Sequence, residues 1–537
     1  MADARATRVP VLVAGGGVTG LSAAVFLAWY GVPTVLVERR GEPLAEPRAR
    51  ALNPRTMELY RAVGLEDAIR AVRSPIADHG VVAHVETLAG AELLRLPDRL
   101  GTGPDPHSPC EWAAIDQDQL EPLLRDRAVA AGVDVRYGTE VVAVRDRPDG
   151  VVAVLRCHRT GCEEEVVADH LVAADGAHSP VRRLLGIGHG GPGTLARKLN
   201  VYFDADLREP LRGRRIVALT VRNPAVQGFL TPVDGVKRWR FALSLGPDDD
   251  TAMTEERCVG LVRAAVGVDD LPITLDHVSD VPWEIAGRVA DRMCAGRVLV
   301  AGDAAHTMPP VGTFGVATGV QDAFNLAWKL ALRHRGQAGP GLVASYETER
   351  LPVARHTTGL TVKRYGLVNG NAGDPRESAR RQRMAMYGYT YPDGAIVPDG
   401  ATPDPVEDPE RPSGAPGTRA PHVPVEHDGQ PVSPVDLMGR DFVLLTGVAD
   451  TGWARTATLA AERTGVGVEH HRTRHLDRFG VTDAGAVLIR PDGFIAWRTP
   501  GADDSDTLVA AINRVLFSPN AKCIRERGGP QRHESVP

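Results

Sequence analysis

The chain has 537 residues, a length that predicts about three domains and a large core that needs no disulfides or metals. A hydrophobic content of 43% and a charged content of 24% exclude a wholly disordered, collagen-like or coiled-coil chain. The net charge of −6 is too small to indicate nucleic acid as the main partner. Only five of the 62 basic residues are Lys, a bias that we attribute to a GC-rich genome.

The predicted elements begin with a βαβ unit, with strands at residues 9–14 and 34–38 on either side of a helix at 21–30. Strand-like runs follow at residues 136–144, 150–157 and 169–175. Apolar strands of this kind are typical of parallel sheets that are buried on both faces.

Residues 196–285 have a different pattern, with alternating runs that contain aromatic residues and predict a separate, largely antiparallel sheet. From residue 296 the first pattern returns, with a strand at 297–301 and a helix at 319–333. Eleven prolines between residues 392 and 434 predict an extended connector. A smaller strand, helix and strand series follows it.

The cysteines and the longest uncharged run indicate the cellular compartment that we expect for the protein. Six cysteines without a CxxC pair form neither a disulfide framework nor a zinc ribbon, so we expect a reducing compartment. The uncharged residues 10–37 are long enough to span a bilayer, but glycines and Pro33 divide them into short elements. We therefore expect a cytoplasmic protein without a targeting segment or a membrane partner.

Residues 15–20 fit the GxGxxG pattern through Gly15, Gly17 and Gly20, between a predicted strand and a predicted helix. The glycines let the backbone approach a pyrophosphate at the helix N-terminus, and Glu38 can accept hydrogen bonds from a ribose. On this motif alone the cofactor is NAD or FAD. A tight turn in a nucleotide-free α/β fold is the alternative.

Two later segments resemble motifs of the single-component flavoprotein aromatic hydroxylases. Residues 171–183 resemble the DG motif of that family, and residues 296–306 resemble its GD motif. Residues 309–315, 319–330 and 345–352 continue the family pattern. Residues 416–422 and 485–498 resemble the thioredoxin-like C-terminal domain of the branch that hydroxylates aromatic polyketides, tetracenomycins, rebeccamycin-type compounds and phenols.

The resemblance implies a mixed fold, α/β combined with α+β. We expect a discontinuous Rossmann-like FAD-binding domain at residues 1–185 and 286–390, and a substrate-binding domain with an antiparallel sheet at 186–285. The connector would occupy 391–435, and a thioredoxin-like domain 436–537.

The resemblance also implies roles for individual residues. Asp303 is similar to the family aspartate that binds the ribityl chain of FAD, and Gln117 to a glutamine near the diphosphate. Arg48 resembles the arginine at the face shared by the flavin and the nicotinamide, although the nearby Arg50 could take that role. Asp175 is associated with both FAD and NAD(P)H, and a capping aspartate is the alternative reading.

Residues near the flavin ring and the substrate follow from the same resemblance. Gly312, Gly315, Val316 and Ala317 belong to the loop and helix start that face the flavin ring, where backbone N–H groups stabilise anionic reduced flavin. We expect the carbonyl of Pro310 near the substrate hydroxyl. The expected pocket residues are Phe229, Arg240, Trp283 and Phe314.

Ala317 departs from the family pattern, which usually has Asn at this position, and Thr313 replaces a common Gly. The departure removes a side-chain hydrogen bond near the flavin. Backbone donors can still hold the pyrimidine edge, so we expect an altered flavin position or reactivity more than a loss of binding. Inactivity is the alternative.

The implied activity is hydroxylation of a phenolic, polycyclic polyketide-type substrate. NADPH or NADH reduces FAD transiently, and O₂ is the co-substrate that gives a flavin C4a-hydroperoxide. A Baeyer–Villiger reaction with the same cofactor, or a catalytically weakened FAD-binding interaction protein, are the alternatives. The protein would be a monomer or homodimer. No metal is expected, because the cluster of His470, His471 and His475 has no nearby Cys.

Overall fold

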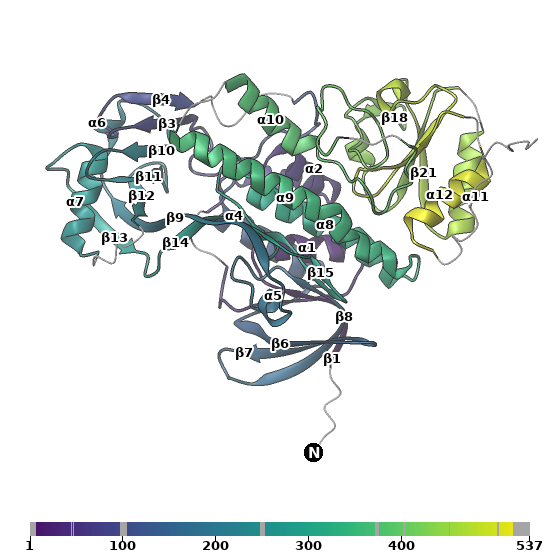
Figure 1. Ribbon diagram of the computed structural model, residues 1–537, viewed down its shortest axis with the longest axis horizontal. Helices are drawn as coiled ribbons and strands as arrows, with labels where there is room; N and C mark the ends of the chain where they lie inside the picture. The colour runs from purple at the N-terminus through teal and green to yellow at the C-terminus, as the bar shows by residue number, and fades with distance from the viewer. Residues whose placement is uncertain are drawn as a thin grey trace, which may run out of the picture. The chain divides into compact units, whose positions relative to one another are not determined.

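The computed structural model describes residues 7–43, 46, 48–96, 105–246, 253–370, 375–400, 404–449, 452–501 and 504–518. The chain forms two compact units. Unit 1 comprises Met1–Phe324 and Val353–Met386, and unit 2 comprises Asn325–Pro352 and Tyr387–Pro537. The expected mixed architecture of several sheets and helices is confirmed (Figure 1).

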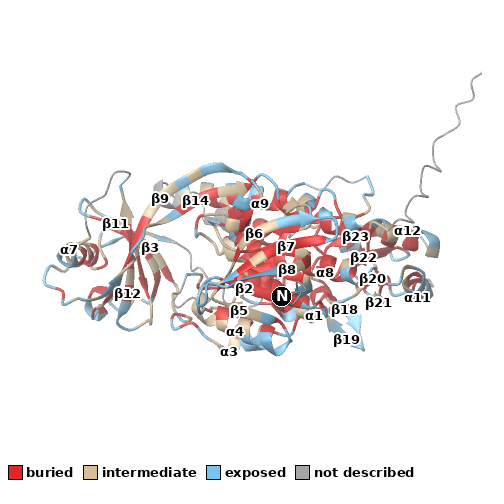
Figure 2. Ribbon diagram, turned by 90° about the horizontal axis from the view of Figure 1, so that it is seen from below, coloured by how far each residue is buried: buried red, intermediate tan, exposed pale blue. Residues whose placement is uncertain are grey.

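The first sheet of unit 1 has eight strands, and its main path runs in the order β15, β16, β8, β1, β2, β5. Its strands are β1 (Thr7–Ala14), β2 (Thr34–Glu38), β5 (Asp134–Tyr137), β6 (Thr139–Arg147), β7 (Gly150–Cys157), β8 (Glu163–Ala173), β15 (Cys294–Ala295) and β16 (Val298–Val300). Strand β1 pairs in parallel with β2 and β8, and β8 pairs in parallel with β16. All of β2 and β16 is buried, as their continuous apolar sequences predict; Figure 2 shows the burial of each element.

Helices and turns connect these strands. They are α1 (Val18–Trp29), α2 (Pro54–Ala62), α3 (Glu66–Ala71), α4 (Gln117–Ala130), α5 (Pro180–Leu184) and the 3-10 turn η1 (Gly302–Ala304). The helices α8 (Phe314–His334), α9 (Pro340–Gly370) and α10 (Pro375–Tyr387) follow in the chain and contribute residues to both units. Within the described ranges, no helix is long and apolar enough to cross a membrane.

The second sheet of unit 1 has nine strands in the order β17, β14, β9, β12, β11, β10, β3, β4, with β13 beside β9. Its strands are β3 (Val81–Val85), β4 (Glu92–Leu96), β9 (His189–Asp204), β10 (Ile216–Arg222), β11 (Gln227–Pro232), β12 (Arg238–Leu245), β13 (Thr274–Val278), β14 (Trp283–Ala290) and β17 (His306–Thr307). Except for the parallel β3–β10 pair, its pairings are antiparallel. The sheet therefore draws on residues 81–96, outside the expected range 186–285.

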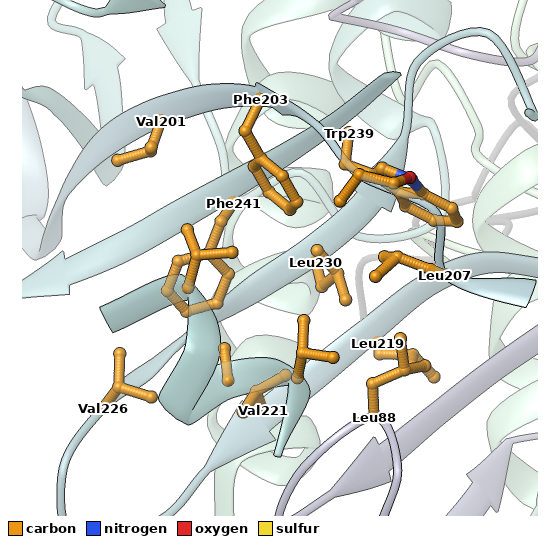
Figure 3. Packing of buried hydrophobic residues seen from close by; sticks show 14 of the residues in the cluster. Leu88, Val201, Phe203, Leu207, Leu219, Val221, Val226, Leu230, Trp239 and Phe241 are labelled. Carbon is orange, nitrogen blue, oxygen red and sulfur yellow. The ribbon is translucent and has the colours of Figure 1, made fainter. Parts of the chain in front are cut away.

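One face of the second sheet packs against α7 (Glu255–Val266), near which lies the short α6 (Arg208–Leu211). In Figure 3 the labelled side chains of Phe203, Trp239, Phe241 and Leu230 point toward one another on this face. Because successive side chains of a strand point to opposite faces, the residues between them lie on the other face. Arg240, between Trp239 and Phe241 on β12, lies on that second face.

Unit 2 contains a six-stranded sheet in the order β19, β18, β21, β20, β22, β23. Its elements are β18 (Val425–His427), β19 (Gln430–Val432), η2 (Pro434–Leu437), β20 (Phe442–Thr446), α11 (Trp453–Thr464), β21 (Val468–Arg472), η3 (Leu476–Phe479), β22 (Ala486–Ile489), β23 (Ile495–Thr499) and α12 (Ser505–Val515). Strand β20 is parallel to β21 and antiparallel to β22. The described part of the Pro-rich segment is packed as well, since Gly417 lies against the backbone of Tyr391.

A network of charged side chains lies in the interior of unit 2. The carboxylate of Glu349 accepts two hydrogen bonds from Arg490, both of 2.8 Å, and one of 2.7 Å from Lys329. It also accepts hydrogen bonds from Asn325 Nδ2 at 2.7 Å and from the backbone N–H of Ala395 at 2.9 Å. Burial alone would raise the pKa of Glu349, but the charges of Arg490 and Lys329 outweigh it and lower the pKa to about 2.

We expect Glu349→Gln to lower the free energy of unfolding by about 3 to 5 kcal/mol, because it leaves Arg490 and Lys329 buried without their counter-charge. Urea denaturation of the full chain, followed by tryptophan fluorescence, measures the change. Since the carboxylate has its lowered pKa only in the folded state, the loss should be constant above pH 4.5 and should shrink as the pH falls toward 2.

Glu377→Gln is the matched control, because Glu377 forms an exposed ion pair with Arg381 on α10. An exposed pair of this kind contributes at most about 1 kcal/mol. Equal losses in the two variants would contradict the stabilising role of the buried network.

Candidate functional site

The site of unit 1 lies at one edge of the parallel sheet. Strands β1, β2, β8 and β16 end at Ala14, Glu38, Ala173 and Val300. Because these strands are parallel, their carboxyl ends lie at the same edge, where open α/β sheets bind ligands. The GxGxxG, DG and GD segments each follow one of these strand ends.

The glycines of residues 15–20 are required by close packing. A Cβ atom on Gly15, which has φ of +110°, would collide with the carbonyl of Ala174, and one on Gly20 would collide with the carbonyl of Gly15. Helix α1 begins at Val18, and no described side chain caps it. Its first N–H groups therefore remain available to an anion at the positive end of the helix.

Thr19 joins three motifs, although it was not among the predicted site residues. A Cβ atom added to Gly302 of the GD segment, or to Gly319 of α8, would collide with the Thr19 side chain. The first turn of α1, η1 and the start of α8 therefore pack directly against one another. The signal in the sequence is the glycine at positions 302 and 319, each of which leaves room for Thr19.

Glu38 is ionised and positioned at the end of β2. Its carboxylate accepts a 2.6 Å hydrogen bond from the N–H of Gly16 and bonds of 2.9 and 3.0 Å from the backbone N–H and Nε of Arg40. Burial raises the pKa of Glu38, but these hydrogen bonds outweigh it and lower the pKa. An ionised carboxylate has further lone pairs that can accept hydrogen bonds from ribose hydroxyls.

Gln117 lies beside the loop that carries Arg48. Its backbone N–H donates to the carbonyl of Ala49 at 2.8 Å, and its Oε1 accepts from the N–H of Ala49 at 3.3 Å. Its Nε2 donates to Glu121 Oε1 at 2.8 Å, and that same Oε1 lies 3.8 Å from a Cβ built on Gly17. Glu121 therefore connects Gln117 to the glycine turn, a contact that the sequence predictions missed.

Arg48 and Arg50 have different surroundings. Arg48 is exposed, whereas Arg50 is buried and pairs with both oxygens of Asp116 at 3.1 and 2.8 Å. Arg50 also donates to the carbonyls of Pro232 and Val233 at the end of β11. Arg50 is thus held by protein groups, and Arg48 is the arginine whose head group is accessible.

Asp303 is accessible to solvent, yet enough protein lies around its carboxyl group to affect its pKa. Burial raises the pKa of Asp303, while His306 and Arg48 lower it in part, so Arg48 lies close enough to act on this carboxyl group. A perturbed, accessible carboxyl group is typical of binding sites. Asp322 holds the turn, because its Oδ2 accepts from the N–H of Gly302 at 3.1 Å and is 2.7 Å from His306 Nε2.

Asp175 makes the contacts of a capping residue. Its carboxylate accepts from Ser179 Oγ at 2.5 Å and from the N–H of Val181, in the first turn of α5, at 2.9 Å. Burial raises the pKa of Asp175, although the bonds from Ser179 and Val181 lower it in part. Asp175 therefore caps the start of α5 in the structure. Its role in binding FAD or NAD(P)H stays a prediction.

The loop before α8 has two successive residues with positive φ, Gly312 at +76° and Thr313 at +61°. Pro310 is exposed in this loop, and Gly315 and Val316 are half-buried in the first turn of α8. Phe314 and Ala317 are buried, with exposed fractions of 3% and 1%. The methyl group of Ala317 thus faces protein, and the backbone of this turn provides the accessible polar groups.

The expected substrate residues of the second sheet lie on the face away from α7. Phe229, Arg240 and Trp283 belong to β11, β12 and β14. Leu230 and Phe241, which follow the first two in sequence, belong to the apolar core, so Phe229 and Arg240 point to the opposite face. Lys198 of β9 lies beside two of them, because it pairs in register with Trp283 and its Nζ is 4.4 Å from the centre of the Phe229 ring. Arg240 lies further along the sheet, where it pairs with Tyr202. The sequence predictions missed Lys198.

The fold and this edge of the sheet define a dinucleotide-binding flavoprotein. Residues 8–361 match the family model described as an FAD binding domain, and residues 413–519 match the aromatic-ring hydroxylase C-terminal domain. The chain belongs to the family of FAD-dependent aromatic-ring hydroxylases. It is a flavoprotein monooxygenase with FAD as its cofactor.

Relatives cover the chain nearly end to end. The tetracenomycin B2 monooxygenase-dioxygenase of Streptomyces olivaceus is 38% identical over 539 residues, with 95% of this chain and 98% of the relative covered. A 4-methyl-5-nitrocatechol 5-monooxygenase of Burkholderia sp is 38% identical, with 95% and 97% covered. The crystal structure of aklavinone-11 hydroxylase with FAD and aklavinone has a TM-score of 0.87 and 34% identity, with 96% and 100% covered.

The residues of the site fit FAD. The uncapped start of α1 suits the pyrophosphate, and the ionised Glu38 suits the adenosine ribose. The accessible carboxyl group of Asp303 can accept hydrogen bonds from the hydroxyls of a ribityl chain.

Asp303→Ala should weaken FAD binding about ten- to hundredfold, because a charge-assisted hydrogen bond contributes about 1.5 to 3 kcal/mol. Quenching of flavin fluorescence during titration of the apoprotein measures the Kd. Asp126→Ala, which removes an exposed carboxylate from α4, is the control. An unchanged Kd in Asp303→Ala would remove this residue from the FAD site.

Thr313→Gly should raise the free energy of unfolding by about 0.5 to 1 kcal/mol. A β-branched residue at φ of +61° is strained, and glycine removes the strain at a smaller cost in chain entropy. The change in Tm of the FAD-loaded protein measures this effect. Thr307→Gly on β17, where φ is ordinary, should instead lower Tm, and a lower Tm in both variants would contradict the strain.

Proposed function

We propose that the protein hydroxylates a polycyclic phenol of the aromatic polyketide type. The observation that carries the proposal is the polar and aromatic face of the nine-stranded sheet, which joins Phe229, Trp283 and Lys198. Two of the proteins compared above are named for tetracenomycin B2 and for aklavinone, and a relative from Streptomyces halstedii is named a putative polyketide hydroxylase. A nitrocatechol hydroxylase has similar identity, so a single-ring phenol is the second candidate.

FAD supplies the reaction with O₂ and the transfer of one oxygen atom, and NADPH or NADH is the transient reductant. The protein binds and orients the aromatic ring and keeps water away from the reacting atoms. In this proposal Gly15, Gly17, Gly20, Glu38, Gln117, Asp175 and Asp303 hold the cofactor. Gly312, Gly315, Val316 and Ala317 lie along the flavin ring.

Arg48 is proposed to act at the face shared by flavin and nicotinamide, because its guanidinium is exposed and lies near Asp303. The carbonyl of Pro310 would contact the substrate hydroxyl, and Phe314 with Phe229, Arg240 and Trp283 would line the pocket. A cytoplasmic location, a monomer or homodimer, and the four-part domain division remain predictions, with β3 and β4 now added to the substrate-binding part.

The test is NAD(P)H oxidation by the FAD-loaded protein, with O₂ uptake and product mass followed together. The panel should contain tetracyclic hydroxyquinones and single-ring catechols. Oxidation that a tetracyclic compound accelerates, with a product heavier by one oxygen atom, is the expected result. NMR of the product then separates ring hydroxylation from Baeyer–Villiger insertion.

Acceleration by single-ring catechols alone would overturn the polycyclic assignment in favour of the second candidate. If the protein has full FAD occupancy and no compound accelerates NAD(P)H oxidation, the proposed hydroxylase function would be replaced by the alternative, a catalytically weakened interaction protein. The same assay with NADPH and with NADH shows which reductant is preferred.

A further inference from the structure

Lys198 is buried on the face of the nine-stranded sheet that points away from α7, and the proposed function assigns no role to it. Lys198 lies on β9 between Arg197 and Leu199, and only 3% of its surface is exposed. All of residues 198–203 on β9 are buried, and of these Val201 and Phe203 belong to the core against α7. Lys198, Asn200 and Tyr202 therefore point away from the α7 core.

Among the residues that the structure describes, the ammonium group of Lys198 has only neutral partners. Its Nζ donates to Ser244 Oγ on β12 and lies 4.4 Å from the centre of the Phe229 ring on β11. Among the described residues Lys198 forms no ion pair. A buried ammonium group without a counter-ion is costly, and an apolar side chain would fill the same space without that cost.

The neighbours of Lys198 form a partly open aromatic corner. Phe229, Ser244 and Trp283 are half-buried rather than buried, so the end of the Lys198 side chain lies among groups that solvent reaches. Trp283 is fixed by a 3.0 Å hydrogen bond from its Nε1 to Asn200 Oδ1. An aromatic ligand placed here would have two ring side chains to pack against and one cation within reach.

We infer that Lys198 binds an acidic oxygen of the aromatic substrate, a phenolate or the enolate form of a hydroxyquinone, and so determines which ring edge the site accepts. The inference deepens the proposed function and rests on it. The bound oxygen would supply the counter-ion that the protein itself does not provide to this ammonium group.

The ionisation of Lys198 supports this assignment. Burial lowers the pKa of Lys198 to about 8, and no charged side chain contributes to the change. The ionisable groups further along the same face are Tyr202 on β9, Arg240 on β12 and His277 on β13, and Tyr202 stacks on His277 at 4.3 Å. The carboxylate of Glu46 lies beside these three groups, 3.6 Å from His277 Nε2, and does not contribute to the pKa of Lys198. With a pKa near neutrality, a neutral amine can accept the phenol proton, which leaves an ammonium–phenolate pair.

The experiment compares two ligands with wild-type and variant holoenzyme. The probe is 1,2-dihydroxyanthraquinone, whose absorbance reports its ionisation, and the reference ligand is its dimethyl ether, which has no acidic oxygen. In wild type, the bound phenol should ionise about one to two pH units below the free compound. Lys198→Met should abolish this shift and weaken binding of the probe about ten- to hundredfold.

Three controls make the result specific to the ammonium group. Binding of the dimethyl ether should be the same in wild type and Lys198→Met, which also shows that the variant is folded. Lys198→Arg keeps the charge and should retain most of the shift. Lys237→Met removes an exposed lysine from the turn between β11 and β12, and it should change the binding of neither ligand.

If Lys198→Met weakens the binding of both ligands equally, the inference is overturned and Lys198 has a packing role. The inference is also overturned if the wild type binds neither ligand up to its solubility limit. The readout is equilibrium binding, so it is separate from turnover. Hydroxylation of a polycycle without any dependence on Lys198 would refute this inference alone. An ionisation shift in a protein that hydroxylates no aromatic compound would refute the proposed function alone.

Discussion

The parallel pairing of β1 with β8, and of β8 with β16, is the constraint on which the site depends. It brings the ends of strands that lie more than a hundred residues apart in sequence to one edge. The glycines then allow the segments that follow these strand ends to come into contact, because Gly15 packs on Ala174 and Gly302 packs on Thr19. Side chains at those glycines would separate the segments, so the cofactor site is as much a consequence of close packing as of its polar groups.

The elements that were predictable from sequence have strong local patterns. Strands β2 and β7 have the predicted bounds, because each is a short apolar run next to turn residues. Residues 81–96 gave no such signal. Their place beside β10 depends on a parallel pairing across more than a hundred residues, which no local pattern encodes.

The contacts of individual polar residues were less predictable than the elements. Residues 345–352 and 485–498 both match the family pattern. That pattern does not reveal that Glu349 and Arg490 form a buried bidentate pair. Arg48 and Arg50 are two residues apart and look alike in sequence. Only the tertiary structure separates them, because Asp116 and the carbonyls at the end of β11 hold Arg50.

The scarcity of lysine is itself informative once the structure is known. The sequence has 57 Arg, yet two of the four lysines in the described ranges are buried, Lys198 and Lys329. An arginine at either place would stay charged, whereas a lysine can lose its proton when burial lowers its pKa. Lys329 has Glu349 as its counter-ion within the protein, but Lys198 has none among the described residues. A buried lysine is therefore neutralised within the protein in unit 2, whereas the one in unit 1 has only a hydroxyl and an aromatic ring beside it in the described residues.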